Sequence, residues 1–343
     1  MNSKTNPAAV LRPARRLVPT KNLSREDWLK QRQQGIGASE AAAAVGLSPY
    51  QSQLELWMLK TGRMQPEPEP SLEEVRSPLY WGQVLEPLVA HHYSQLTGHK
   101  VRRVNAILQH ADEDKAWMLA NLDYAVVKND QVQILECKTA GEYGIHLWKE
   151  GVPEYIQCQV QHQLAVTGKQ AADVAVLLAG QSFKTFRIER DEILIQELIE
   201  LERQFWRWVE TDTPPPADGS ESAQKALQAL FPEDTGEVLD WTEEASELPS
   251  DRLNELNQAF DQLNQLKEQI NQLKAREEAC KQTLQQALGD ATQANLKAGK
   301  ITWKRSKDGQ VLDAKRLQED LPQLYKDYLT TRPGSRRFLI KPQ

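Results

Sequence analysis

The chain has 343 residues, 40% of them hydrophobic and 26% charged, a composition typical of a globular protein with room for one large domain or two ordinary ones. No apolar stretch comes near the roughly 20 residues that span a bilayer, and the beginning of the chain has no apolar signal core, so we expect a cytoplasmic protein without membrane contact. The three cysteines are too few for a disulfide scaffold and too scattered for a metal or redox motif. The net charge of −6 argues weakly against nucleic acid as a partner, but basic residues gather near both ends of the chain, so the total charge does not decide which partners bind locally.

Helical and strand-like patterns alternate along the chain up to residue 212. The first 24 residues show no clear period and are expected to form a mobile basic tail. Apolar residues at helical spacing predict a helix beginning at residue 25 and further helices over 39–46, 54–60, 78–96, 153–166 and 192–209. Short β-rich segments predict an antiparallel meander over 101–109, 117–127 and 131–138, and two more strands over 173–179 and 183–189. We therefore expect an α/β domain over residues 25–212.

A proline-rich segment separates this domain from the rest of the chain. Residues 213–222 predict a linker, followed by an accessory region over 223–343. Apolar residues at alternating three- and four-residue spacing predict a coiled-coil helix over about 250–288, whose apolar stripe must bury against another helix of the chain or a neighbouring subunit. A basic α+β module is expected over about 299–343, with strands over 300–307 and 336–341 and a helix over 312–328.

The basic module carries candidates for accessory contacts with DNA. Basic side chains beside a tryptophan suit phosphate contacts and base stacking, and the alternative is a solvated basic surface. The candidate residues are Trp303, Lys304, Arg305, Lys307, Arg336 and Arg337.

The sharpest local pattern is a hairpin that carries two acids and a lysine. A two-residue turn at Asn129-Asp130 would place Asp123 opposite Glu136, close enough for the two carboxylates to share one cation. The period-two alternation of a strand then puts Glu136 and Lys138 on one face. Oxygen ligands favour Mg²⁺, or Mn²⁺, over zinc. The alternative for this pattern is a surface hairpin with a simple acid–lysine ion pair.

Several separate motifs resemble one nuclease family. Asp123 followed by Glu136-Cys137-Lys138 resembles the core of PD-(D/E)XK nucleases, and within them the lambda-exonuclease or YqaJ-type viral recombinase family. The resemblance covers about residues 28–208 and includes Arg32 with Gly35-Ile36-Gly37-Ala38-Ser39-Glu40, Trp81-Gly82-Gln83-Val84-Leu85-Glu86, and Gln159-Val160-Gln161. The leading proline of the motif is missing, since Asn121-Leu122-Asp123 stands in its place. The resemblance implies a restriction-endonuclease-like core, a mixed central sheet flanked by helices.

The resemblance also implies a role for each matched residue. Metal ligation would fall to the carboxylates of Asp123 and Glu136 and the backbone carbonyl of Cys137, while Lys138 would position the attacking water. Glu86 would help to hold a second ion, and Gln159 would touch the site, with Gln161 the weaker candidate. Arg32 and Ser39 would bind the 5′-phosphate of the digested strand.

The implied function is a Mg²⁺-dependent exonuclease that digests one strand of linear duplex DNA, 5′ to 3′, in a bacterial or phage-infected cell. Resemblance further implies a homotrimer and a single-strand annealing protein as partner. The alternatives are a PD-(D/E)XK endonuclease of the restriction or repair type and a non-catalytic DNA-binding recombination adaptor. An iron–sulfur nuclease is disfavoured because the sequence lacks the necessary cysteine cluster.

Overall fold

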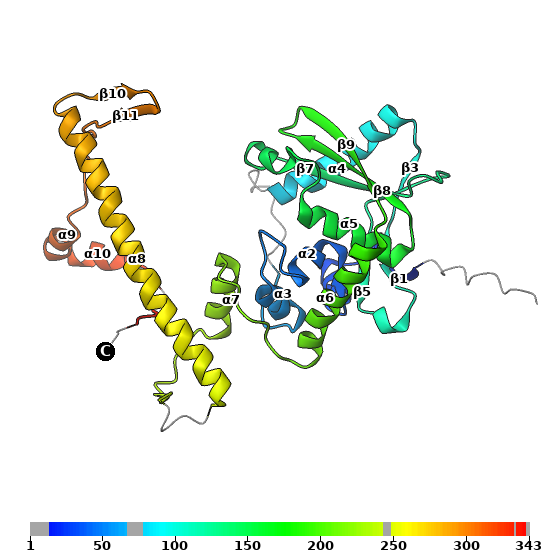
Figure 1. Ribbon diagram of the computed structural model, residues 1–343, viewed down its shortest axis with the longest axis horizontal. Coiled ribbons are helices and arrows are strands. Elements are labelled where there is room, and N and C mark those ends of the chain that lie inside the picture. The colour runs from blue at the N-terminus through cyan, green and yellow to red at the C-terminus, as the bar shows by residue number, and fades with distance from the viewer. Residues whose placement is uncertain (1–13, 67–77, 243–247, 333, 341–343) are drawn as a thin grey trace, which may run out of the picture. The chain divides into compact units, whose positions relative to one another are not determined.

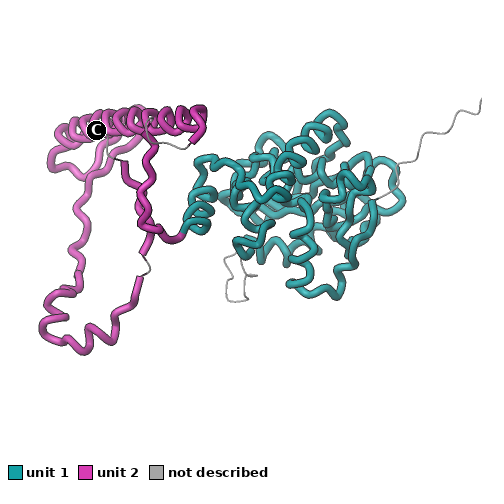
Figure 2. The backbone as a smooth tube through the Cα atoms, turned by 90° about the horizontal axis from the view of Figure 1, so that it is seen from below, with its two compact units in different colours: residues 1–231 teal, residues 232–343 magenta. Residues whose placement is uncertain are grey.

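The computed structural model describes residues 14–66, 78–242, 248–332 and 334–340. The chain divides into two compact units, residues 1–231 and 232–343, which are shown in different colours in Figure 2 and are described separately here. None of the helices in the described ranges is both long and apolar enough to cross a membrane.

The first unit holds two sheets with helices packed on them (Figure 1). Its strands are β1 (Arg15–Pro19), β2 (Ile36–Gly37), β3 (Val101–Arg103), β4 (Ala106–Gln109), β5 (Met118–Asn121), β6 (Tyr124–Val126), β7 (Ile134–Ala140), β8 (Ala171–Leu178) and β9 (Ser182–Glu189). Its α-helices are α1 (Arg25–Arg32), α2 (Ala41–Ala44), α3 (Gln53–Lys60), α4 (Pro78–Thr97), α5 (Glu154–Thr167), α6 (Glu192–Glu210) and α7 (Glu221–Leu230). Its described residues also form the 3₁₀ helices η1 (Ala38–Glu40), η2 (Glu113–Lys115) and η3 (Glu142–Trp148).

Both sheets are mixed. The five-stranded sheet has the order β3-β6-β7-β8-β9, in which β7 and β8 run parallel and every other neighbouring pair is antiparallel. The four-stranded sheet has the order β1-β4-β5-β2, with β2 and β5 parallel. The mixed α/β architecture agrees with the fold class expected from the sequence.

Strand β7 is central because its two faces pack against different helices. Leu135 and Cys137 join a buried cluster with residues of α4, whereas Ile134 joins the main core with residues of α5. Successive side chains of a strand point to opposite faces, so Glu136 and Lys138 share the α5 side with Ile134. The predicted common face of Glu136 and Lys138 is therefore confirmed.

Two predicted strands are broken in the structure. The segments 101–109 and 117–127 each split, so that β3 and β6 belong to the five-stranded sheet while β4 and β5 belong to the four-stranded one. The breaks lie side by side, since Val104 N–H donates to the Asp123 carbonyl at 3.1 Å. The expected meander is therefore wrong in its topology, because the chain passes from one sheet to the other at both points, although the pairs β3–β6, β4–β5 and β6–β7 are antiparallel as expected.

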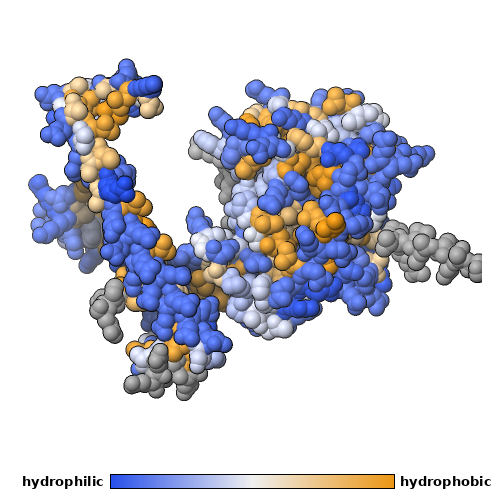
Figure 3. Space-filling view, in the orientation of Figure 1, coloured by the Kyte–Doolittle hydropathy of each residue, from blue (hydrophilic) through white to orange (hydrophobic). Residues whose placement is uncertain are grey.

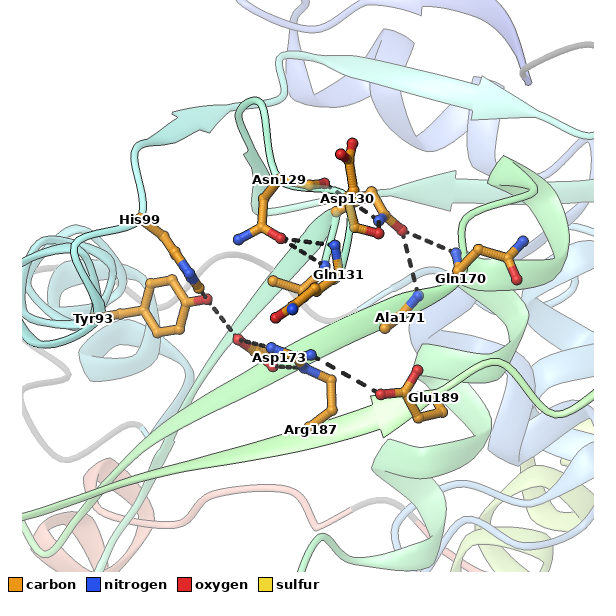
Figure 4. Close-up of polar contacts among 12 residues, drawn as sticks. Tyr93, His99, Asn129, Asp130, Gln131, Gln170, Ala171, Asp173, Arg187 and Glu189 are labelled. Atoms are coloured by element: carbon orange, nitrogen blue, oxygen red, sulfur yellow. Dashed lines mark hydrogen bonds and ion pairs between the residues drawn. The ribbon is translucent and has the colours of Figure 1, made fainter.

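The hairpin between β6 and β7 has the predicted register but a different turn. Tyr124 pairs with Leu135 and Ala125 with Ile134, a register that, carried back one residue, sets Asp123 opposite Glu136. The left-handed residue is Lys128, with φ of 53°, and not the Asn-Asp pair. The side-chain oxygen of Asn129 instead accepts from the backbone N–H groups of Gln131 and Val132, at 2.9 and 3.0 Å (Figure 4). The connection is therefore a longer Asx-type loop, and β7 begins at Ile134.

A polar network fixes α4 to the five-stranded sheet. The Tyr93 hydroxyl on α4 donates to Asp173 on β8 at 2.6 Å, and Asp173 also pairs with Arg187 on β9 (Figure 4). Burial and the hydrogen bond to Asp173 raise the pKa of Tyr93 above the ordinary phenol value, so the hydroxyl stays a donor. The network holds in place the helix that carries Glu86.

The boundaries of the first unit differ from those expected. Residues 15–19, expected in a mobile tail, form strand β1 paired with β4, and residues 1–13 lie outside the described residues. Helix α7 packs on α3, where Ser222 Oγ accepts from the Ser52 N–H at 2.8 Å and donates to Glu55. The compact unit therefore runs to residue 231 rather than 212.

The second unit is built around one long helix. Its elements are α8 (Ser250–Leu288), β10 (Gln293–Leu296), β11 (Gly299–Thr302), α9 (Ala314–Asp320) and α10 (Pro322–Asp327). The single helix expected over 312–328 is two helices, since Pro322 begins α10 and cannot continue α9. The expected strand over 300–307 ends at Thr302, and no strand forms over residues 336–340, while residue 341 lies outside the described residues.

The predicted helix over 250–288 is confirmed, but the burial of its apolar stripe is not observed in the described part of the chain. Most large apolar side chains of α8 are exposed, including Phe260, Leu266, Ile270, Leu273 and Leu284. Figure 3 shows further apolar side chains at the surface beside β10 and β11.

Candidate active site

One pocket of the first unit gathers the residues singled out by the sequence motifs. Its volume is about 450 Å³, and its walls come from α1, η1, α4, β7, α5 and the segment between β5 and β6. The predicted residues that line it are Arg32, Ser39, Glu86, Asp123, Glu136, Cys137, Lys138 and Gln159.

Asp123 reaches across to β7. The residue lies between β5 and β6, and its Oδ2 accepts from the backbone N–H of Cys137 at 2.8 Å. This contact ties the start of β6 to β7 and holds the carboxylate beside the Glu136–Lys138 face. Because Oδ2 is already engaged, Oδ1 is the oxygen of Asp123 with the greater capacity for another ligand.

Glu136 is buried and surrounded by donors. Its side chain is only 2% exposed, and Oε1 accepts from Lys138 Nζ at 2.7 Å and from Gln159 Nε2 at 2.6 Å. Oε2 accepts from Gln163 Nε2 at 2.8 Å. The two glutamines lie one helical turn apart on α5, so this helix holds both oxygens of the carboxylate. One lone pair of Oε2 remains for a further partner.

Lys138 is held as a cation. Its Nζ also donates to Gln159 Oε1 at 3.0 Å. Burial alone would lower the pKa of Lys138, but the carboxylates of Glu136 and Asp123 outweigh it and raise the pKa above the ordinary value. Lys138 is therefore a hydrogen-bond donor to Glu136 and Gln159.

The acids of the pocket repel one another. Burial, followed by the neighbouring Glu136, raises the pKa of Asp123 well above its ordinary value of 3.8. The folded chain therefore keeps the Asp123 proton to a higher pH than the unfolded chain does, and this group lowers the stability of the fold as pH rises above 3.8. Any cation bound between the acids would relieve this cost.

Glu86 on α4 lines the same pocket and interacts electrostatically with Glu136. Its Oε1 lies 3.2 Å from Arg103 Nη2 on β3, although the pair is not aligned as a hydrogen bond. Burial raises the pKa of Glu86 against the opposing effect of Arg103, and Glu136 raises it further. Arg103 was not expected at the site, and its position in sequence gives no sign that β3 lies beside α4.

The donor set fits a hard divalent cation. No group of three or more acidic, histidine or cysteine side chains converges on one point within the described residues. The pocket is instead lined by the carboxylate-bearing residues Asp123, Glu136 and Glu86 and by Cys137, and its volume of about 450 Å³ leaves room for water. Mg²⁺ commonly takes one or two carboxylates and retains several waters, so this incomplete oxygen set suits it.

A second polar group faces the pocket from α1 and η1. Arg32 Nη2 donates to Ser39 Oγ at 3.0 Å and pairs with Glu40 Oε1 at 2.8 Å. The guanidinium also lies over the Trp28 ring, 4.7 Å from its centroid. Arg32 Nε is buried and has no hydrogen-bond partner among the described residues.

Other predicted residues lie elsewhere. The amide of Gln161 donates to the Glu189 carbonyl at 2.8 Å and accepts from the Asp191 N–H at 3.2 Å, so it joins α5 to the start of α6 and does not touch the acids. Its role as a site residue is therefore wrong. The six candidates of the basic module belong to the second unit, whereas residues of the first unit line the pocket. The six candidates of the basic module are Trp303, Lys304, Arg305, Lys307, Arg336 and Arg337.

Besides Arg103, three residues near the site were not predicted. Gln163 could have been found, because it follows Gln159 by one helical turn and so shares its face of α5. Glu40 and Lys60, which pair at 2.6 Å beside Arg32, gave a weaker signal. Glu40 lies within the matched motif, but nothing in the sequence brings α3 to it.

Comparisons with known proteins identify the family that the sequence motifs resemble. Residues 27–170 match the model of the YqaJ-like viral recombinase domain. The Bacillus subtilis (strain 168) protein named uncharacterized protein YqaJ is 32% identical over 336 residues, which cover 95% of this chain and 97% of that protein. An alkaline exonuclease from Laribacter hongkongensis is similar in structure at 24% identity and a TM-score of 0.45, covering 55% of this chain and 94% of its own. A phage-related exonuclease from Haemophilus somnus 129PT is similar at 11% identity and a TM-score of 0.34, covering 52% and 96% respectively.

Proposed function

This chain belongs to the YqaJ-like viral recombinase family, and from that premise we propose that it is a metal-dependent exonuclease that digests one strand of linear double-stranded DNA. The observation that carries the proposal is one pocket lined by two polar groups, Asp123–Glu136–Lys138 and Arg32–Ser39. The first suits hydrolysis of a phosphodiester, and the second suits a grip on a terminal phosphate. An enzyme that grips a 5′-phosphate while it cuts would proceed 5′ to 3′ and leave a 3′ single strand for recombination.

The proposal includes a nuclease core of the PD-(D/E)XK type. Its sheet would be the five-stranded one, flanked by α4 and α5, with the acids on β7 and just before β6. The mixed strand order and the Glu136–Lys138 face of β7 support this assignment.

A divalent cation, Mg²⁺ or Mn²⁺, would be held by the carboxylates of Asp123 and Glu136 and the backbone carbonyl of Cys137. When bound, it would polarise the scissile phosphate and lower the pKa of a water ligand. Glu86, which lines the same pocket from α4, would support a second ion.

The chain's own residues then supply orientation and charge. Gln159, Gln163 and Lys138 each donate one hydrogen bond to the Glu136 carboxylate, and together they hold it in one orientation. Lys138, held protonated by the acids, would orient the attacking water and stabilise negative charge on the phosphate oxygens. The lysine therefore acts as a donor in this proposal and not as the general base.

Arg32 and Ser39 would hold the 5′-phosphate. Arg32 and Ser39 both line the pocket wall, and a guanidinium binds phosphate oxygens in pairs. An internal phosphodiester carries less negative charge than a terminal phosphate, so this group favours ends over internal sites.

A cleavage assay tests the proposal. The full chain is incubated with linear and closed-circular duplexes, with either Mg²⁺ or EDTA, and the products are resolved by size. We expect Mg²⁺-dependent release of nucleotides from linear duplex only, loss of activity in Asp123→Asn and a loss of at least about 100-fold in Lys138→Ala. Asp130→Asn, in the exposed loop between β6 and β7, is the matched control and should retain wild-type activity.

Other outcomes have distinct meanings. Cutting of closed circles would identify an endonuclease, and duplex binding without any metal-dependent cleavage would identify a DNA-binding adaptor. Full activity of Lys138→Ala would refute the assigned chemistry.

The proposal extends to partners and to the second unit. A homotrimer and a single-strand annealing partner follow from the family resemblance, and light scattering tests the first of these. The basic module would add DNA contacts through Trp303 and the cations that follow it. The full chain with Lys304, Arg305 and Lys307 changed to glutamine should then bind duplex more weakly, with a shallower dependence of affinity on salt. An unchanged salt dependence would contradict this role.

A further inference from the structure

One buried cation near the pocket has no part in the proposed chemistry. Lys60 lies at the end of α3, and its side chain is only 2% exposed. Its Nζ donates to Glu40 Oε2 at 2.6 Å and to the backbone carbonyl of Arg32 at 2.7 Å. Burying an ammonium group costs stability unless the group is paired and hydrogen-bonded, as Lys60 is here.

Glu40 stands between two cations. Its Oε1 pairs with Arg32 Nη2 at 2.8 Å, and its Oε2 accepts from Lys60 Nζ and from the Gly37 N–H, the latter at 2.7 Å. Burial would raise the pKa of Glu40, but Arg32 and Lys60 lower it to about 2, so the carboxylate is ionised at neutral pH.

The approach of Gly37 is close. A Cβ at this position would lie 2.9 Å from Arg32 Nη2 and 3.1 Å from Glu40 Oε2. The backbone therefore leaves just enough space for the Arg32–Glu40 pair, and the orientation of the guanidinium is fixed from several sides.

Arg32, Glu40 and Lys60 form a triad of charged side chains joined by two ion pairs. Arg32 and Glu40 together are neutral, and a neutral pair attracts a phosphate only weakly. With Lys60 protonated, the triad carries one net positive charge; burial lowers the pKa of Lys60, and the Glu40 carboxylate that accepts from its Nζ opposes that effect. Lys60 is buried and does not line the pocket. In a partly buried site of lowered dielectric, one unit of charge has a large effect on the binding of an anion.

We infer that Lys60 is a positioning residue that neutralises Glu40, so that Glu40 can orient Arg32 without cancelling its attraction for the 5′-phosphate of a DNA end. The inference rests on the proposed function, because it assigns a partner to the phosphate anchor of that same site. Lys60 acts through Glu40 and Arg32 and does not touch the substrate.

Compensating substitutions test this arrangement. Full-length wild type, Lys60→Met and the double variant Glu40→Gln/Lys60→Met are compared on duplexes with 5′-phosphate or 5′-hydroxyl ends, and the ratio of the two kcat/KM values is measured for each. We expect Lys60→Met to lower the ratio about tenfold, chiefly through KM for the phosphorylated end. The double variant removes one charge of each sign, so it should regain the ratio to within about threefold of wild type.

The controls separate charge from folding. Lys30→Met on α1 removes an exposed cation that pairs with Glu26, changes the net charge by the same amount, and should leave the ratio unchanged. Circular dichroism reports folding, and binding of a 5′-phosphorylated duplex in EDTA measures the anchor without turnover. If Lys60→Met does not fold, Lys60→Gln makes the same charge change with a polar side chain.

Each outcome decides a separate question. If Lys60 is needed only for packing, the double variant will have a kcat/KM ratio no closer to wild type than that of Lys60→Met. That result, or an unchanged ratio in Lys60→Met, overturns the inference while the proposed function stands. Equal cleavage of both kinds of end by wild type overturns the phosphate anchor and the inference with it. Restoration of the ratio by the second substitution supports the charge balance.

Discussion

Replacing Gln163 on α5 by methionine tests whether the buried carboxylate of Glu136 depends on its amide. The side chain is fully buried, and its Nε2 donates to Glu136 Oε2 at 2.8 Å. Methionine has a similar volume, so little cavity forms. A hydrogen bond to a charged group contributes about 1.5–3 kcal/mol, but the amide oxygen of Gln163 has no partner among the described residues, and its removal offsets part of that loss.

We therefore expect the free energy of unfolding to fall by about 1–2 kcal/mol. Activity should fall further than stability suggests, by about 10–100-fold, because each 1.4 kcal/mol of lost orientation at Glu136 is a factor of ten in rate. The assays are urea unfolding and Mg²⁺-dependent digestion of linear duplex.

Gln161→Met is the matched control. Gln161 lies on the same helix, is 4% exposed, and uses its amide between Glu189 and Asp191, away from the acids. It should lose comparable stability but keep activity. Equal activities in the two variants would show that the contact with Glu136 does not matter for catalysis.

Three further results are expected. Asp123→Asn should raise the melting temperature in EDTA at pH 8, with a gain that shrinks toward pH 4, because it removes the carboxylate whose pKa burial and Glu136 raise; a constant difference across pH would contradict that assignment. Gly35→Ala should destabilise the fold by more than about 2 kcal/mol, since its Cβ would lie 2.3 Å from the Trp117 carbonyl oxygen; wild-type urea unfolding would show that this backbone can yield. A chain ending at residue 231 should melt at a higher temperature than one ending at residue 212, which lacks α7; equal melting temperatures would show that α7 adds nothing to the unit.

The sequence predicted the centre of the site for a physical reason. Strand periodicity places Glu136 and Lys138 on one face whatever the tertiary structure, and counting back from the loop aligned Asp123 with Glu136. That count succeeded although the turn itself was wrong, because the pairing of β6 with β7 keeps the register while Asn129 and Lys128 rearrange the loop between them.

Other features depended on contacts that no local pattern records. The breaks near Val104 and Asp123 arise where two strands change sheets together, and each segment alone reads as one continuous strand. Lys60 contacts Glu40 across the sequence because α3 packs beside η1, and α7 joins the first unit through Ser222, which bonds Ser52 and Glu55, and through the buried Ala226. The proline-rich segment looked like a boundary, but a short helix beyond it packs back on the domain.

The alternation along β7 has a consequence for how this domain can change by mutation. Exchanging one side chain at Leu135 or Cys137 alters packing under α4 and leaves the acid on the other face in place. Deleting one residue within the strand would instead turn every following side chain over, so that Lys138 would move into the α4 cluster and the cysteine would leave it. Single-codon losses inside β7 should therefore be absent from functional descendants of this gene. The loop at Lys128 can gain or lose residues, because β8 and α5 hold β7 in place without contribution from that loop.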